Sequence, residues 1–252
     1  MHTVFASYDW GLVWDNRSIL LRGLLTAAEV AVVGLVLSVI IGLFLALLRM
    51  GPKPGSWIAA TYVNVFRGVP ALVSVIWVYF GLSLLLGIEF TVFQAGVIAL
   101  TLLYSAFIAE IYRSALIAVP RGQREAGLAL GMHPARIFAS VTLPQATKMA
   151  IPNIGSMFIG MVKDTSTFTV IGLVEVVRVT QNINSTYFQP FVLYTAAAAL
   201  YVAAAFAVDF LFRGIEKVME NPPKGRIARA VTGRKRRRIN ALVERVGASQ
   251  TT

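Results

Sequence analysis

Ionisable side chains within apolar stretches are the residues of this sequence best suited to chemistry. The set comprises Glu29, Arg67, Glu110, Lys163, Asp164 and Asp209. A charge in a bilayer core costs about 2.5–3.5 kcal/mol even on mild insertion scales, so such residues face a protein interior or a wet cavity and usually pair. One interpretation is mutual neutralisation, with Arg67 or Lys163 pairing with Glu110. The other is a polar site for a zwitterionic solute, in which a cation receives the carboxylate and a carboxylate receives the ammonium group.

The strongest candidate for such a site is the segment Lys163-Asp-Thr-Ser-Thr167, which interrupts an apolar run near its middle. Glycines flank it on both sides, and glycine-interrupted spans mark midplane binding sites in transporters. We expect Asp164 to contact an ammonium group and Thr165 and Ser166 to form hydrogen bonds with the solute. Lys163, Glu110 and Arg67 are further candidates for the pathway. For the hydroxyls, the alternative is that they satisfy only freed backbone groups. For Glu110, the alternative is that it belongs to a gate or an ion pair.

Thiol and metal chemistry have little support in this composition. The chain has no cysteine, which excludes disulfides, thiol catalysis and cysteine-based metal sites. Its two histidines, His2 and His133, are too few and too far apart for a histidine-rich metal site. We therefore predict no metal site and no catalytic residues.

The elements that position these residues are predicted to be membrane helices. Hydrophobic residues make up 57% of the 252 and charged residues only 14%, against about 25% charged in soluble domains, and the mean hydropathy is +0.70. A span needs about 20 mostly apolar residues, and five runs approach that length: 22–49, 69–86, 92–109, 149–174 and 191–212. They lack the two-residue alternation of barrel strands. We predict an all-α polytopic bundle.

The distribution of charge predicts the topology of these spans. Most of the 23 Lys and Arg residues fall in two loops and the C-terminal tail that share one side if five spans cross, so the positive-inside rule predicts an outside N-terminus and a cytoplasmic C-terminus. We expect an interfacial segment at 1–21, a transmembrane domain at 22–215 with a cytoplasmic loop at 113–148, and a disordered tail at 216–252. The basic run Arg234–Arg238 is assigned to anionic lipid head groups and not to nucleic acid.

The long cytoplasmic loop has the pattern of a helix–glycine–helix elbow. Pro120 opens a helix that includes Glu125 and Ala126, and Gly131 can end it. His133-Pro134 then turns the chain, because a residue before proline leaves the α region. A second short helix is predicted from Pro134 towards Leu143-Pro144. Such an elbow would present a rigid surface to a cytoplasmic partner.

This stretch resembles the EAA loop of ABC importer permeases. Glu125-Ala126-Gly127 is followed by Gly131 and then by Val141, Leu143 and Pro144, which fits the pattern E-A-A-x3-G-x9-I-x-L-P. Gly127 and Val141 depart from it while keeping size and polarity close. Further motifs resemble the polar amino-acid uptake branch of the family: Phe66-Arg-Gly-Val-Pro70, Ala109-Glu-Ile-Tyr-Arg113, Pro120-Arg-Gly-Gln123 and Lys163-Asp-Thr-Ser166.

The resemblance implies a type I permease fold in the inner membrane and a transport subunit that is not itself an enzyme. In such importers two permeases, identical or related, form the pathway, two cytoplasmic ATPase subunits drive it, and an extracytoplasmic binding protein delivers the amino acid. Glu125, Ala126, Gly127, Gly131, Leu143 and Pro144 would then couple the chain to the ATPase. The chain has no G-x4-G-K-[S/T] loop, so ATP is expected to bind the partner and no cofactor to bind this subunit.

Two rival functions remain on the sequence alone. One is an ion- or proton-coupled secondary transporter that uses Glu110 and Asp164 as proton sites, although that class commonly has inverted repeats and none is evident here. The other is a membrane anchor or assembly subunit with no pathway, which leaves the charges within the spans unexplained.

Overall fold

The structure is a computed structural model that describes residues 8–220, and within that range every regular element is helical, as predicted. One compact unit ends at Arg213, and a second begins at Gly214. The disordered tail was predicted at 216–252, but residues 216–220 belong to helix α11 (Pro190–Glu220). The rest of that segment lies outside the described residues, and the proposed domain boundaries stay a prediction. The elements are α1 (Gly11–Asp15), α2 (Arg17–Met50), α3 (Gly55–Gly68), α4 (Ala71–Ile76), η1 (Trp77–Leu82), α5 (Ser83–Leu86), α6 (Val92–Ala118), α7 (Arg121–Ala129), α8 (Pro134–Ile137), η2 (Phe138–Thr142), α9 (Leu143–Asp164), η3 (Thr165–Ile171), α10 (Val176–Tyr187) and α11 (Pro190–Glu220).

Three helices, α2, α6 and α11, are long and apolar enough to cross a membrane on their own. At 1.5 Å per residue, the 34 residues of α2 extend about 51 Å, well beyond a hydrocarbon core of about 30 Å. A capping box starts α6: the Thr91 hydroxyl accepts the Gln94 N–H at 3.2 Å, and the Gln94 side chain accepts the Thr91 N–H at 3.0 Å. These reciprocal bonds satisfy two backbone donors that the first turn leaves unpaired.

A second span is broken at a proline. Helix α3 and the segment from Ala71 to Leu86 are together long and apolar enough to cross a membrane, with a bend of 109° between them. Val69, directly before Pro70, is extended at φ −92° and ψ 129°, because the proline ring disfavours helical geometry in the preceding residue. The predicted run at 69–86 is therefore only part of this element, which begins at Gly55 with α3.

The remaining span is also bent. The helical segment 134–171 is followed, at an angle of 50°, by α10. Within it, α9 ends at Asp164 and the chain tightens into the 3₁₀ turn η3, after which Gly172 adopts φ +92°. The predicted interruption at 163–167 thus takes the form of a change in helical winding, with Lys163 and Asp164 still in the α-helix.

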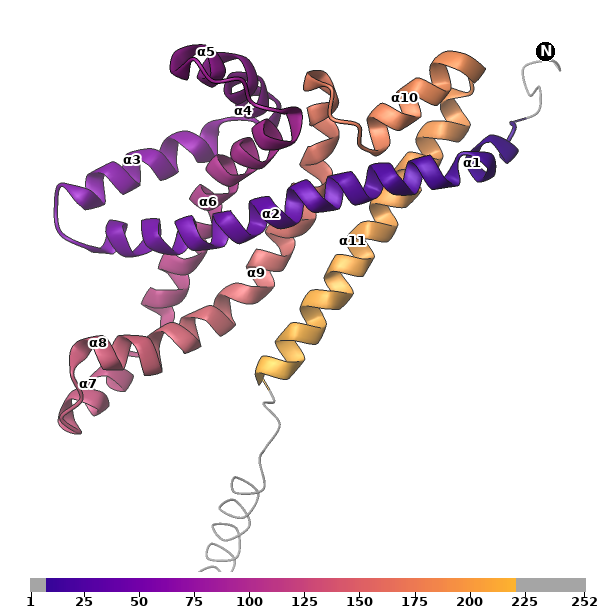
Figure 1. Ribbon diagram of the computed structural model, residues 1–252. Helices are drawn as coiled ribbons and strands as arrows, with labels where there is room; N and C mark the ends of the chain where they lie inside the picture. Colours follow the sequence, from indigo (N-terminus) through magenta and orange to yellow (C-terminus); the bar gives the residue numbers. More distant parts are fainter. Residues whose placement is uncertain (1–7, 221–252) are drawn as a thin grey trace, which may run out of the picture. The chain divides into compact units, whose positions relative to one another are not determined.

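Helix α6 lies at the centre of the compact unit, where it packs against α2, α3, α4 and α9. Close approach of α2 depends on Gly42, since a Cβ there would lie 2.8 Å from Ile108 Cγ2. Figure 1 shows α2 crossing α6, and α9 running from the α7–α8 corner back along α6. Small residues at such crossings let membrane helices make close van der Waals contact.

Candidate functional site

The elbow begins with α7, whose end has the geometry predicted from Gly131. Gly131 adopts φ +72°. Its N–H donates to the Leu128 carbonyl at 2.9 Å, and the Met132 N–H donates to the Gly127 carbonyl at 3.0 Å. This pair of bonds is the Schellman motif, which favours glycine because a Cβ strains the left-handed conformation. Glu125 and Ala126 are exposed on α7, and the exposed apolar Leu130 follows directly.

Gly127 lies at the closest contact inside the elbow. It is buried, and a Cβ at this position would lie 2.8 Å from Ile137 Cγ1 and 2.9 Å from Ile137 Cδ1. Although glycine and alanine are close in size, the methyl group of an alanine here would require Ile137 to shift. The missing methyl group lets α7 and α8 pack directly against each other.

The second arm of the elbow differs from the prediction. The His133 ring accepts the Ala135 N–H at 3.3 Å and caps α8, but the helix does not stop at Leu143-Pro144. It continues through the π-helical turn η2 into α9, whose first turn contains both residues. Proline is tolerated at a helix start because its missing N–H would have no partner there. A continuous helical path therefore joins the elbow to Asp164.

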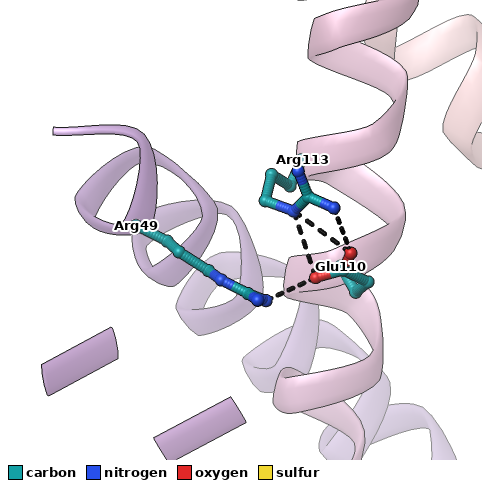
Figure 2. Close-up of polar contacts among 3 residues, drawn as sticks. All are labelled: Arg49, Glu110 and Arg113. Atoms are coloured by element: carbon teal, nitrogen blue, oxygen red, sulfur yellow. Dashed lines mark hydrogen bonds and ion pairs between the residues drawn. The ribbon is translucent and has the colours of Figure 1, made fainter. Parts of the chain in front are cut away.

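Glu110 forms the centre of an ion-pair cluster near the elbow end of α6. Its carboxylate accepts hydrogen bonds from Arg49, in the last turn of α2, and from Arg113, one turn along α6 (Figure 2). The Arg113 Nε lies 3.1 Å and 3.2 Å from the two carboxylate oxygens. Glu110 thus belongs to an ion pair, which was one of the open alternatives, but its partners are Arg49 and Arg113 and not Arg67 or Lys163.

Arg67 and Glu110 nevertheless line one cavity of about 460 Å³ between α3, α6 and α9. Ser114 and Asn153 add polar atoms, and the remaining lining is Phe107, Ile111, Ala115, Ala118, Met149 and Met157. The Arg67 guanidinium lies 5.6 Å from the centre of the Phe107 ring, within cation–π range. Since Glu110 is bonded to two other arginines, Arg67 makes no hydrogen bond to a carboxylate within residues 8–220.

The Lys163–Thr167 segment does not converge on a single site. Asp164 turns toward α6, where its carboxylate accepts a hydrogen bond from the Tyr104 hydroxyl at 2.9 Å. Lys163 and Ser166 line a separate groove of about 640 Å³ between α9 and α11. Thr165 is fully buried and donates to the Val162 carbonyl at 2.7 Å, as the alternative interpretation of these hydroxyls requires.

Sequence reasoning missed a buried carboxylate at the start of α10. Glu175, which directly follows the predicted run 149–174, has no exposed surface. Its carboxylate accepts hydrogen bonds from the Val177 and Arg178 N–H groups at 2.7 and 2.8 Å and from the Tyr201 hydroxyl at 2.6 Å. The available signal was local: an acid directly before an apolar helical run is a potential N-cap.

Comparison with known proteins agrees with this architecture. The sequence model of the family described as "Binding-protein-dependent transport system inner membrane component" matches residues 38–221. The chain belongs to this family of inner-membrane transport components. Membership supports the permease interpretation over the secondary transporter.

Individual members of the family align over most of the chain. The glutamine transport system permease protein GlnP of Escherichia coli K12 is 33% identical over 215 residues, which cover 84% of this chain and 98% of that protein. The arginine transport system permease protein ArtQ of Bacillus subtilis 168 is 32% identical, with coverage of 84% and 98%.

Solved structures of two ABC transporters share the fold. An amino acid ABC transporter crystallised with histidines superposes with a TM-score of 0.76 at 33% identity, over 83% of this chain and 98% of that one. A subunit of the methionine transporter MetNI in an inward-facing conformation gives a TM-score of 0.70 at 22% identity, over 81% and 98%. The chain therefore has the fold of an ABC importer permease.

Proposed function

We propose that this chain forms part of the translocation pathway of an ATP-driven importer for a polar amino acid. A second permease, of the same or a related sequence, completes the pathway, two cytoplasmic ATPase subunits drive it, and an extracytoplasmic binding protein delivers the substrate. Relatives named for glutamine and for arginine transport support an amino-acid substrate. The ATP that powers transport binds the ATPase partner, so this subunit is not an enzyme.

The observation that carries the proposal is the position of Arg67 in the cavity between α3, α6 and α9. The cavity, at about 460 Å³, falls in the range of about 300–1,000 Å³ of small-ligand sites. Glu110 is held by Arg49 and Arg113, so the Arg67 guanidinium is available to a substrate carboxylate, to which it can donate two parallel bonds. The Asn153 amide and the Ser114 hydroxyl can accept hydrogen bonds from the ammonium group.

Coupling to the ATPase follows from the helical path between elbow and cavity. Glu125 and Ala126 are exposed on α7, while Gly127 packs against α8 and Gly131 ends α7. Because α8, η2 and α9 are joined without a break, a tilt imposed on α7 by the closing ATPase pair would move Leu143, Pro144 and Asn153 together. The substrate cavity would thereby open or close with the state of ATP.

We assign the elbow to the cytoplasm and the N-terminus to the outside. Both ends of α2 have the tryptophans typical of membrane interfaces: Arg17 lies 5.2 Å from the Trp14 ring, and Lys53 lies 4.7 Å from the Trp57 ring. The second of these ends lies on the side of the elbow, whose segment 113–148 carries five further Lys and Arg residues, as cytoplasmic segments do. Anionic lipid head groups would contact this side.

Uptake into vesicles that contain the complete transporter tests the proposal. We expect vanadate-sensitive, ATP-dependent uptake that survives an uncoupler, and we expect Arg67→Gln to reduce it at least tenfold. Lys163→Gln serves as the matched variant, because this second span cation lines the other groove. Uptake abolished by an uncoupler at constant ATP would contradict the importer. Normal uptake by Arg67→Gln together with lost uptake by Lys163→Gln would move the pathway to the α9–α11 groove.

A further inference from the structure

Helices α6 and α9 face each other along matching stripes. The cavity is lined on α6 by Phe107, Ile111, Ser114 and Ala118, and on α9 by Met149, Asn153 and Met157. These positions recur every three or four residues, so each set shares one helix face. One turn further from the elbow, the same stripes reach Tyr104 on α6 and Gly160 on α9, and a second turn of α9 reaches Asp164.

Tyr104 and Asp164 meet where the two stripes leave the cavity. The Tyr104 hydroxyl donates to Asp164 Oδ2 at 2.9 Å, and its ring lies 6.1 Å from the ring of Phe107, which lines the cavity. Tyr104 is only 6% exposed. The bond therefore ties α6 to α9 directly beyond the end of the cavity that lies away from the elbow.

Gly160 is what lets the tyrosine reach its partner. A Cβ at this position would lie 2.9 Å from the Tyr104 hydroxyl oxygen. Real Cβ atoms essentially never approach so closely, so any other residue would displace the hydroxyl or the helix. Gly160 leaves space for the Tyr104 hydroxyl, and Asp164 accepts its hydrogen bond. The two residues lie one helical turn apart on the same face of α9.

We infer that Tyr104 is a positioning residue that holds Asp164 against α6 and thereby closes the substrate cavity at the end opposite the elbow. This inference rests on the proposed function, in which the cavity belongs to the pathway. A carboxylate within a span is costly without a partner. Asp164 can therefore leave Tyr104 only for another donor, and the ammonium group of an amino acid delivered from that end supplies one. When the substrate arrives, Asp164 exchanges the Tyr104 hydroxyl for the ammonium group, and the contact between α6 and α9 opens in the same step.

The absence of cysteine from the sequence makes a clean test possible. A single cysteine is placed at Ala118, at the elbow end of the cavity, in the complete transporter without ATP. A membrane-impermeant thiol reagent is then added on the side opposite the elbow. We expect Tyr104→Phe and Gly160→Ala each to raise the labelling rate at least fivefold. Tyr112→Phe is the matched control: Tyr112 is 4% exposed on the same helix and has no hydrogen-bond partner for its hydroxyl among residues 8–220.

Variants of Asp164 separate closure from substrate contact. Asp164→Asn keeps an acceptor oxygen for the tyrosine, so labelling should stay within twofold of the parent while uptake falls. Asp164→Ala removes the acceptor, and labelling should rise as it does for Tyr104→Phe. Co-purification of the ATPase verifies that each variant is assembled.

Equal labelling of the parent, Tyr104→Phe and Asp164→Ala would overturn the inference, as would an equal rise in Tyr112→Phe. If Arg67→Gln abolishes uptake while labelling stays unchanged in Tyr104→Phe, only the closure by Tyr104 is refuted. If Arg67→Gln transports normally, the proposed pathway itself is refuted.

Discussion

The guanidinium of Arg49 binds the carboxylate of Glu110 across 61 residues of sequence, and it joins the last turn of α2 to the elbow end of α6 (Figure 2). Arg113 shares the same carboxylate from within α6. This arrangement uses both Glu110 oxygens and leaves Arg67 free of a hydrogen-bonded carboxylate among the described residues. The ion pair therefore ties two spans together. Under the proposed function it also leaves Arg67 as the cation that the cavity offers to a substrate.

Breaking this cluster should destabilise the chain. The Glu110 side chain is 23% exposed, so Glu110→Gln should lower the free energy of unfolding by about 1–3 kcal/mol, less than the loss of a fully buried partner because solvent screens the stranded arginines. Asp209→Asn is the comparison, since its pair with Arg213 is more exposed, at 43% and 68%, and should cost about 0–1 kcal/mol. Thermal unfolding in detergent measures both, and an equal loss in the two variants would contradict the assignment.

The contact between Gly127 and Ile137 predicts coupled substitutions. Gly127→Ala should overpack the elbow and cost about 1–3 kcal/mol, because the added methyl group would lie 2.8 Å from Ile137 Cγ1. Ile137→Ala should cost about 2–5 kcal/mol through the cavity that it leaves. In the double variant the new methyl group occupies part of that cavity, so the combined loss should be smaller than the sum. A double-mutant cycle on stability decides this, and strict additivity would mean that the two residues do not interact.

The left-handed conformation of Gly131 predicts a graded series. Gly131→Ala places a Cβ at φ +72° and should cost about 1–2 kcal/mol of elbow stability, whereas Gly131→Asn should cost less because asparagine tolerates this region. Gly131→Asp adds a charge at the proposed docking surface and should uncouple ATP hydrolysis from transport or release the ATPase. Gly122→Ala is the matched control on α7, since a Cβ there meets nothing within 4 Å. Normal ATPase binding and coupling in Gly131→Asp would rule out the coupling role.

The buried carboxylate of Glu175 predicts sensitivity at three positions. Tyr201→Phe removes the 2.6 Å donor to a fully buried acid and should cost about 1–3 kcal/mol. Gly23→Ala should also destabilise, because its Cβ would lie 2.9 Å from the Glu175 backbone carbon, which cannot move aside like a flexible side chain. Glu175→Gln keeps a side-chain oxygen acceptor and should be milder than Glu175→Ala. Thermal unfolding orders the variants, and equal stability of Glu175→Gln and Glu175→Ala would show that the acceptor does not matter.

Local patterns in the sequence were sufficient for the first arm of the elbow and for the spans formed by α2, α6 and α11. Gly131 was identified as a helix end because left-handed geometry favours glycine wherever it occurs. Pro134 marked the next helix start because proline at the first helical position leaves no N–H without a partner. The sequence did not predict that α8 continues into α9. Leu143-Pro144 has the pattern of a helix end, and only the structure shows the π-helical turn η2 that leads into α9. Helix α3 was missed because its apolar run is short and Arg67 lies at its end.

The sequence by itself determined the helical class, the apolar runs and the geometry at Gly131, because each depends on neighbouring residues and on the length needed to cross a bilayer. Only the tertiary structure decided which polar side chains bind each other. Arg49 with Glu110 and Tyr104 with Asp164 join residues 61 and 60 positions apart. Which side chains meet depends on how far each helix is rotated and shifted against its neighbour. Close approach at a glycine such as Gly42 or Gly160 fixes that relative position.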